Sequence, residues 1–174
     1  IPDIDPTAGF TRKIAFTVPG YLGTESLTNI PVLVRLSTAI AGFDYADCLT
    51  NGADLAFEDA DGNAIPYDID TWNPVGESLV WVKLPALNAT TTAFTMYFGS
   101  PEPAVNSPSD VWADYAGVWH LNEAGDGAKS IADSTTNQAV GNSSANSKSR
   151  ANGILGGARG MTLTAKNGPA VTVT

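Results

Sequence analysis

The sequence predicts an all-β protein, an antiparallel β-sandwich of the jelly-roll or immunoglobulin-like kind with a β-rich C-terminal extension. Apolar and polar residues alternate in short runs, which are bounded by Gly, Pro, Asn or Thr. No segment keeps a sustained helical period. Of the 174 residues, 43% are hydrophobic and only 16% are charged. This composition is typical of a β-rich globular chain and argues against wholesale disorder.

Short alternating runs predict the individual strands. In the first run, Ile14, Phe16 and Val18 fall on one face, as in a half-buried strand. Similar runs predict further strands over residues 32–36, 94–98, 118–121, 161–164 and 170–174. One short helical turn is expected within residues 43–49.

The best-defined element is a hairpin of two strands joined by a loop rich in turn residues. The register that keeps one face apolar pairs Trp72 with Leu79, Asp70 with Trp81, and Asp68 with Lys83. A slip of one residue would turn both aspartates into the core. A second, tighter hairpin turn is expected at residues 59–63, where Gly62 supplies a positive φ.

These patterns divide the chain into three parts. Residues 1–100 hold most of the clear strands and form the sandwich domain. Residues 101–117 are a connector rich in Pro and Ser, and residues 118–174 are the β-rich extension. Within the extension, residues 125–153 are rich in Gly, Ser, Asn, Ala and Thr, which predicts a long loop.

Charge is distributed unevenly along the chain. The formal charge is −9, which argues against nucleic-acid binding and against attraction to anionic membranes. The sequence shows no membrane-spanning segment, so we do not expect membrane insertion. Residues 1–126 carry 17 acidic and 4 basic side chains, a balance of −13, whereas residues 127–174 carry 1 acidic and 5 basic, a balance of +4. The two parts would attract each other, within one chain or between neighbouring copies, unless the split arises by chance.

Several segments resemble a known family: residues 29–36, 52–62, 66–72, 79–85 and 95–99. In this order they are similar to a bacterial extracellular domain of unknown function that recurs in large surface proteins. The resemblance covers about residues 10–100. It implies a β-sandwich and brings no catalytic residue with it.

A second resemblance lies further along the chain. Residues 111–123, 133–135 and 153–158 are similar to the start of a concanavalin A-like, laminin-G-like domain, which often follows the first family. Residues 110–174 supply too few strands for such a sandwich. The chain is therefore a fragment, or it folds this part onto its first domain, or a neighbouring subunit completes it.

Aromatic and acidic residues of the predicted hairpin suggest a glycan site. Trp72, Trp81 and Tyr97 are expected on one outward face together with Asp68 and Asp70. Aromatic rings stack on sugar C–H faces while carboxylates accept from hydroxyls. The competing interpretation is that residues 110–174 cover this face.

Two segments are candidate calcium sites. Asp59, Asp61 and Asn63 have the spacing of the first ligands of a calcium loop, although Ala64 stands where that loop needs glycine. A plain hairpin turn is the competing interpretation. Asp133 with Asn137 is the second candidate, because laminin-G-like folds often hold calcium through such loops. Calcium is the one cofactor that the sequence suggests.

The sequence does not predict an enzyme. His120 is the only histidine, it lies between Trp119 and Leu121, and no nucleophile-elbow motif accompanies it. Asp68 and Asp70 would lie about 7 Å apart along a strand, but nothing else supports a glycosidase. The single cysteine, Cys48, has no basic neighbours in sequence, so we expect a small buried side chain and not a reactive thiol.

We therefore expect a non-catalytic adhesion or structural module of a bacterial surface protein, with polysaccharide as its partner. The alternative is a self-assembling subunit of a filament, tube or sheath, completed by strand exchange between copies. A glycan-active enzyme is a third hypothesis. The expected location is extracellular or at the cell surface, with a signal peptide removed or outside this sequence.

Overall fold

A computed structural model describes residues 9–20, 23–150 and 153–160, together with the backbone of residues 171–173. The chain divides into two compact units, Ile1–Val111 and Trp112–Thr174, which are called unit 1 and unit 2 below. Among the described residues, no helix has the length and apolar character needed to cross a membrane.

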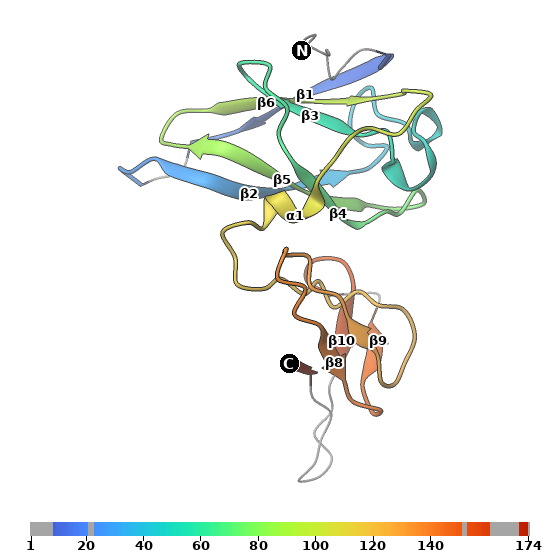
Figure 1. The fold of residues 1–174 in the computed structure, drawn as a ribbon. Coiled ribbons are helices and arrows are strands. Elements are labelled where there is room, and N and C mark those ends of the chain that lie inside the picture. Colours follow the sequence, from blue (N-terminus) through green and yellow to red (C-terminus); the bar gives the residue numbers. More distant parts are fainter. Residues whose placement is uncertain (1–8, 21–22, 151–152, 161–170, 174) are drawn as a thin grey trace. The chain divides into compact units, whose positions relative to one another are not determined.

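Unit 1 is a β-sandwich, which confirms the predicted fold class (Figure 1). Its first antiparallel sheet contains, in spatial order, β1 (Arg12–Val18), β6 (Thr92–Phe98) and β3 (Ala56–Asp59). Its second contains β2 (Leu27–Leu36), β5 (Ser78–Leu87) and β4 (Tyr67–Thr71). Each sheet is three strands wide, so each has two edges.

The core lies between the two sheets, where alternation directs apolar side chains. On β5, Val80 and Val82 are fully buried, and Met96 on β6 is fully buried as well. The rings of Phe57 on β3 and Tyr67 on β4 meet at 5.1 Å and join the two sheets. Each such buried side chain contributes roughly 1.5–3 kcal/mol. The predicted alternation over residues 13–18, 32–36 and 94–98 is thus confirmed as strand.

The segment between β2 and β3 is held by a buried carboxylate. It contains two single-turn 3-10 helices, η1 (Tyr45–Asp47) and η2 (Thr50–Gly52), and η1 confirms the helical turn expected within residues 43–49. Asp54 is fully buried and accepts hydrogen bonds from the Leu49 N–H at 2.7 Å and the Gly99 N–H at 2.8 Å. Asp54 therefore ties this segment to the end of β6.

The register that we predicted for the β4–β5 hairpin is wrong by two residues. Asp68 lies opposite Trp81, not Lys83, and Ile69 lies opposite Val80. The error has two parts. Thr71, not Trp72, lies opposite Leu79, and a bulge between Ile69 and Thr71 adds a second residue that the alternation does not reveal. Because the shift is even, Tyr67 and Ile69 still share the face of Val82 and Val80.

The segment after β6 belongs to the sandwich. The Ala104 N–H donates to the Ala53 carbonyl at 2.8 Å. The short helix α1 (Pro108–Val111) packs on β4 and β5, on the side of their sheet away from the core (Figure 1). There the Lys83 Nζ donates to the Asp110 carbonyl, and Val111 is fully buried. The expected connector, residues 101–117, is thus divided by the unit boundary at Val111.

Unit 2 is built from very short strands. One antiparallel sheet contains, in order, β11 (Val171–Val173), β8 (Gly141–Ser143) and β7 (Ser130–Ile131). A two-stranded sheet pairs β9 (Lys148–Arg150) with β10 (Ala158–Gly160).

The predictions for this part of the chain are confirmed only in part. The strand expected at 170–174 is present as β11, and the one expected at 161–164 lies outside the described residues. The strand expected at 118–121 is irregular instead, because the main chain of Val118 bonds to Asp133 and Ser134. The long loop expected over 125–153 is wrong in part, because β7, β8 and β9 lie within it.

Gly52 provides a test of the packing beneath η2. Its φ is +69°, and an added Cβ would lie 2.6 Å from Cζ3 of Trp72. Gly42 has a similar φ of +84° but open space around it. Gly52→Ala and Gly42→Ala share the backbone penalty, and only Gly52→Ala adds the clash. We expect Gly52→Ala to unfold at lower urea, by about 1–3 kcal/mol relative to Gly42→Ala. Equal midpoints would contradict the packing described here.

Candidate functional site

The structure does not bring the five predicted glycan-site residues together. Trp72 turns toward the core, where its ring meets that of Tyr45 at 5.1 Å. Tyr97 lies on the outer face of the other sheet, with its ring 6.1 Å from that of Phe10. Only Asp68 and Trp81 remain neighbours, opposite each other on the sheet that carries α1.

Two further findings concern this face. Asp70 sits at the bulge, where its carboxylate accepts from the Thr71 hydroxyl at 3.2 Å. Asp68 is only 9% exposed, and α1 packs on the two strands that carry Asp68 and Trp81. The bulge separates Trp72 from the predicted set, and α1 covers part of the face on which the set was expected.

The first calcium candidate is a hairpin turn organised by Asp59. Its Oδ1 accepts from the N–H groups of Asp61 at 3.0 Å and Asn63 at 2.8 Å, and the Asn63 amide also donates to both carboxylate oxygens. Burial would raise the pKa of Asp59, but these hydrogen bonds outweigh it and lower that pKa. The Asp59 carboxylate thus accepts hydrogen bonds from main-chain N–H groups of the turn, as the hairpin-turn interpretation predicts.

The second calcium candidate is also a structural centre. The Asp133 carboxylate accepts from the N–H groups of Val118, Thr135 and Ala139 and from the Thr135 hydroxyl, all at 2.8–3.0 Å. Burial alone would raise the pKa of Asp133, but these bonds lower it to about 2. Asn137 donates through its amide to the Ala116 carbonyl at 3.1 Å. Four protein donors therefore surround the Asp133 carboxylate, which is the predicted calcium ligand.

Arg159 is a structural residue that sequence reasoning missed. It is 6% exposed, and its guanidinium donates to the carbonyls of Glu123, Gly125 and Gly127 at 2.7–3.1 Å. It also donates to the hydroxyls of two serines, Ser143 and Ser147. Four of its five partners are glycines or serines, and they form no sequence motif that predicts a buried arginine.

Cys48 and His120 are the remaining chemically reactive side chains that the sequence singled out. Burial, then the nearby carboxylates of Asp54, Asp47 and Asp44, raise the pKa of Cys48 to about 12, so its thiol stays protonated at neutral pH. The His120 ring packs against Trp112 at 5.8 Å. Over the described residues, no three His, Cys, Asp or Glu side chains are grouped so as to hold a metal ion.

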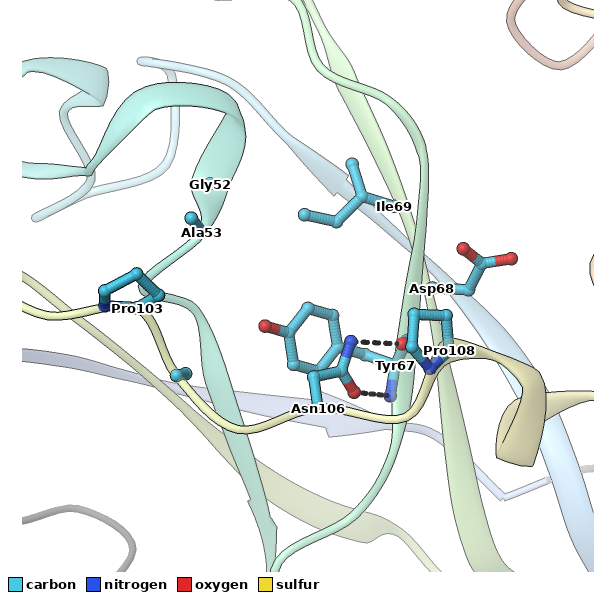
Figure 2. Close-up of a pocket in the computed structure, with 9 residues that line it drawn as sticks. Gly52, Ala53, Tyr67, Asp68, Ile69, Pro103, Asn106 and Pro108 are labelled. Carbon is cyan, nitrogen blue, oxygen red and sulfur yellow. Dashed lines mark hydrogen bonds between the residues drawn. The ribbon is translucent and has the colours of Figure 1, made fainter.

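A pocket of about 350 Å³ lies beside the free edge of β4 (Figure 2). The Asn106 side chain borders it and forms two hydrogen bonds with Tyr67, donating to its carbonyl at 2.9 Å and accepting from its N–H at 3.3 Å. Asn106 thus replaces a neighbouring strand at that point. The other lining residues are mostly small or apolar: Gly52, Ala53, Asp68, Ile69, Pro103, Ala104 and Pro108.

A second hollow, of about 250 Å³, lies at one end of the sandwich, and we call it the end notch. One wall is the Asp59–Asp61 turn. The other is the β5–β6 hairpin loop, in which the Asn88 side chain accepts from the Thr90 N–H at 2.8 Å. The notch is lined by carboxylate, amide and hydroxyl groups together with a few apolar side chains: Asp59, Ala60, Asp61, Leu84, Pro85, Ala86, Asn88, Thr90, Thr91, Thr92 and Ala93.

Comparison with known proteins finds one family model that is similar to part of the chain. Residues 51–129 match the family model described as a domain of unknown function, DUF2341. No curated protein and no solved structure matches the chain. The expected domain of unknown function is confirmed in part, because the match covers residues 51–129 and not residues 10–100 as expected. The matched segment begins in η2, contains β3 to β6 and continues past Val111, where the start of a concanavalin A-like domain was expected. The comparisons do not support that second domain.

The hydrogen bonds around Asp133 make a pH-dependent prediction for unit 2. The pKa of Asp133 is about 2 in the folded protein, below its ordinary 3.8, so protonation favours unfolding. Its stabilising contribution is complete above about pH 4 and is lost as the pH falls toward 2. In NMR spectra, the amide protons of Val118 and Ala139 should shift with a midpoint near pH 2. A midpoint near 3.8 would contradict the assignment.

A substitution of Asp133 tests the same hydrogen bonds at neutral pH. Asp133→Asn replaces one acceptor oxygen with a donor that faces N–H groups, so unit 2 should lose about 1–2 kcal/mol. Asp61→Asn makes the same chemical change at an exposed position and should leave stability within about 0.5 kcal/mol.

Proposed function

We propose that the protein is a non-catalytic adhesion module of a bacterial extracellular surface protein, and that the end notch of its sandwich binds carbohydrate. The single observation behind the proposal is the notch itself. Its walls offer the carboxylate of Asp61, the amide of Asn88 and the hydroxyls of Thr90–Thr92. These are the groups that exchange hydrogen bonds with sugar hydroxyls.

The walls of the notch are preorganised by their own hydrogen bonds. The Asp59 carboxylate fixes the turn that carries Asp61, and Asn88 fixes the loop that carries Thr90 and Thr91. Both loops are anchored on the rigid sandwich. A site that is already ordered loses less conformational entropy on binding, which favours recognition of a flexible polar ligand.

The acids with lowered pKa support a binding role over a catalytic one. The carboxylates of Asp59 and Asp133 accept hydrogen bonds from the main chain, and this is what lowers their pKa. A catalytic acid or base needs a pKa near the working pH. The sparse charge and the resemblance to a family of surface proteins support the extracellular location.

A second candidate function is self-assembly into an extracellular filament, tube or sheath. One specific observation favours it. Unit 2 exposes an apolar hairpin tip, Ile154 and Leu155, and unit 1 holds a pocket of mostly small and apolar residues beside β4.

Binding to immobilised polysaccharides tests the carbohydrate proposal. The intact protein should be retained by at least one polysaccharide of a panel, assayed with and without calcium. Asp61→Ala removes an exposed notch carboxylate and should weaken that binding about tenfold or more. Glu102→Ala removes an exposed carboxylate outside the notch and should leave binding unchanged.

Two outcomes would contradict the proposal. One is no retention on any polysaccharide, and the other is retention that Asp61→Ala and Thr91→Ala leave intact while both variants unfold at the wild-type midpoint. Release of soluble sugars with turnover would contradict the non-catalytic part.

A further inference from the structure

The turn between β9 and β10 exposes two large apolar side chains. Ile154 is 99% exposed and Leu155 is 40% exposed. The Gly153 N–H donates to the Gly156 carbonyl at 2.8 Å, and Gly156 has a φ of +64°. This tight turn places Ile154 and Leu155 at its two central positions, so they form the tip of the hairpin. Apolar side chains at such a tip are energetically costly to leave in water.

Unit 1 offers a cavity of matching chemistry beside β4. Pro103, Ala104, Ala53 and Ile69 give it apolar walls, and its volume is about 350 Å³. That is near the lower end of ligand pockets, which run roughly 300–1,000 Å³. It therefore suits one or two aliphatic side chains better than an extended ligand.

The sheet edge beside the pocket adds a polar element. Lys83 N–H donates to the Pro66 carbonyl, so Pro66 faces β5, whereas the main chain of Tyr67 faces Asn106 on the open side. Along an antiparallel edge strand, the main-chain N–H and C=O groups of successive residues point alternately toward the neighbouring strand and away from it. The N–H and C=O of Ile69 therefore point toward the same open edge as those of Tyr67, at the wall of the pocket. A polypeptide segment that enters there meets main-chain donors and acceptors as well as apolar walls.

We propose that the β9–β10 hairpin tip of one copy inserts Ile154 into the β4 pocket of a second copy. The contact joins two different surfaces, so each copy carries one tip and one pocket. Contacts of this kind are heterologous and extend into open chains unless a rotation closes them into a ring. The inference goes beyond carbohydrate binding and specifies the contact for the assembly candidate.

Charge complementarity favours a second copy as the occupant. Unit 1 carries 14 acidic and 4 basic side chains, a formal charge of −10, and Asp68 and Asp70 lie on β4 itself. The hairpin of the tip, residues 148–160, carries three basic side chains and no acidic one. Of these, Arg150 on β9 is exposed, Lys148 is exposed and forms a salt bridge with Asp126 at 2.9 Å, and Arg159 is buried. Arg150 is therefore the basic group of the hairpin that we expect to face the acidic surface of unit 1. The association should therefore weaken as salt increases.

The contact should be weak for an isolated pair. A stable protein interface buries about 1,200–2,000 Å² in total, and one hairpin tip in one pocket falls well below that range. Association therefore needs high protein concentration or tethering at a surface. Each junction of an open chain is one such contact, so the length of the chain should rise with local protein concentration.

Sedimentation velocity of the full chain tests the proposal. The weight-average mass should rise above 18.0 kDa as protein concentration increases over about a hundredfold range. Ile154→Ser, which shortens the tip without adding charge, should lower the association constant about tenfold or more. Val75 is 98% exposed on a loop of unit 1, and Val75→Ser should leave association unchanged.

A complementation experiment identifies the two surfaces. Ala104→Phe fills the pocket but keeps the tip, and Ile154→Ser keeps the pocket but removes the tip. Each variant alone should be largely monomeric. Their mixture should form dimers and no longer species, because only one productive contact is possible per pair. Matching urea midpoints for wild type and variants would confirm that both still fold.

Three results would overturn the proposal: a wild-type chain that stays monomeric at every concentration, association that Ile154→Ser leaves unchanged, or a mixture that forms no dimer. Ile154 lies outside the end notch, so polysaccharide binding by Ile154→Ser reports separately on the proposed function. Loss of assembly in Ile154→Ser with polysaccharide binding intact would support both proposals. Loss of assembly in Ile154→Ser, when the wild-type chain binds no polysaccharide, would support the contact and contradict only the carbohydrate proposal.

Discussion

The buried contact between two narrow sheets is the constraint on which the rest of unit 1 depends. Three strands a side give a thin sandwich, in which Phe57, Tyr67 and Met96 lie in one shared apolar layer. Narrow sheets also leave a large share of their main chain at edges and ends, where N–H and C=O groups need partners. Polar side chains meet that need: Asp54 at the end of β6, Asp59 at the turn after β3, and Asn106 at the edge of β4.

This use of polar groups shapes what the protein can do. The same logic recurs in unit 2, where strands of two or three residues are held by Asp133 and by the buried guanidinium of Arg159. The carboxylates of Asp59 and Asp133 accept hydrogen bonds from the main chain, and the thiol of Cys48 is held protonated. The functions that we propose rest on surfaces: the end notch, the pocket beside β4, and the exposed tip at Ile154. Adhesion and assembly are both activities of surfaces.

Local alternation predicted the sandwich strands well, because each strand buries one face and its pattern is written in consecutive residues. The hairpin register failed by two residues, because Thr71 rather than Trp72 lies opposite Leu79 and a bulge at Asp70 adds one more residue. That bulge also moved Trp72 away from the predicted glycan residues. The core and the Asp59 turn were therefore predictable. The pocket was not, since it needs Asn106 to meet Tyr67 across 39 positions of sequence. In unit 2, the role of Arg159 depends on distant carbonyls that no local pattern marks.

Residues 100–111 complete the sandwich, because Asn106 pairs with the β4 edge at Tyr67 and α1 covers part of the outer face of its sheet. Urea unfolding of two fragments, residues 1–111 and residues 1–99, tests it most directly. The shorter fragment lacks the two Asn106 hydrogen bonds and the buried side chain of Val111. The account predicts that it is less stable by at least about 2 kcal/mol. Equal stability of the two fragments would contradict the account, because the sandwich would then be complete without its connector.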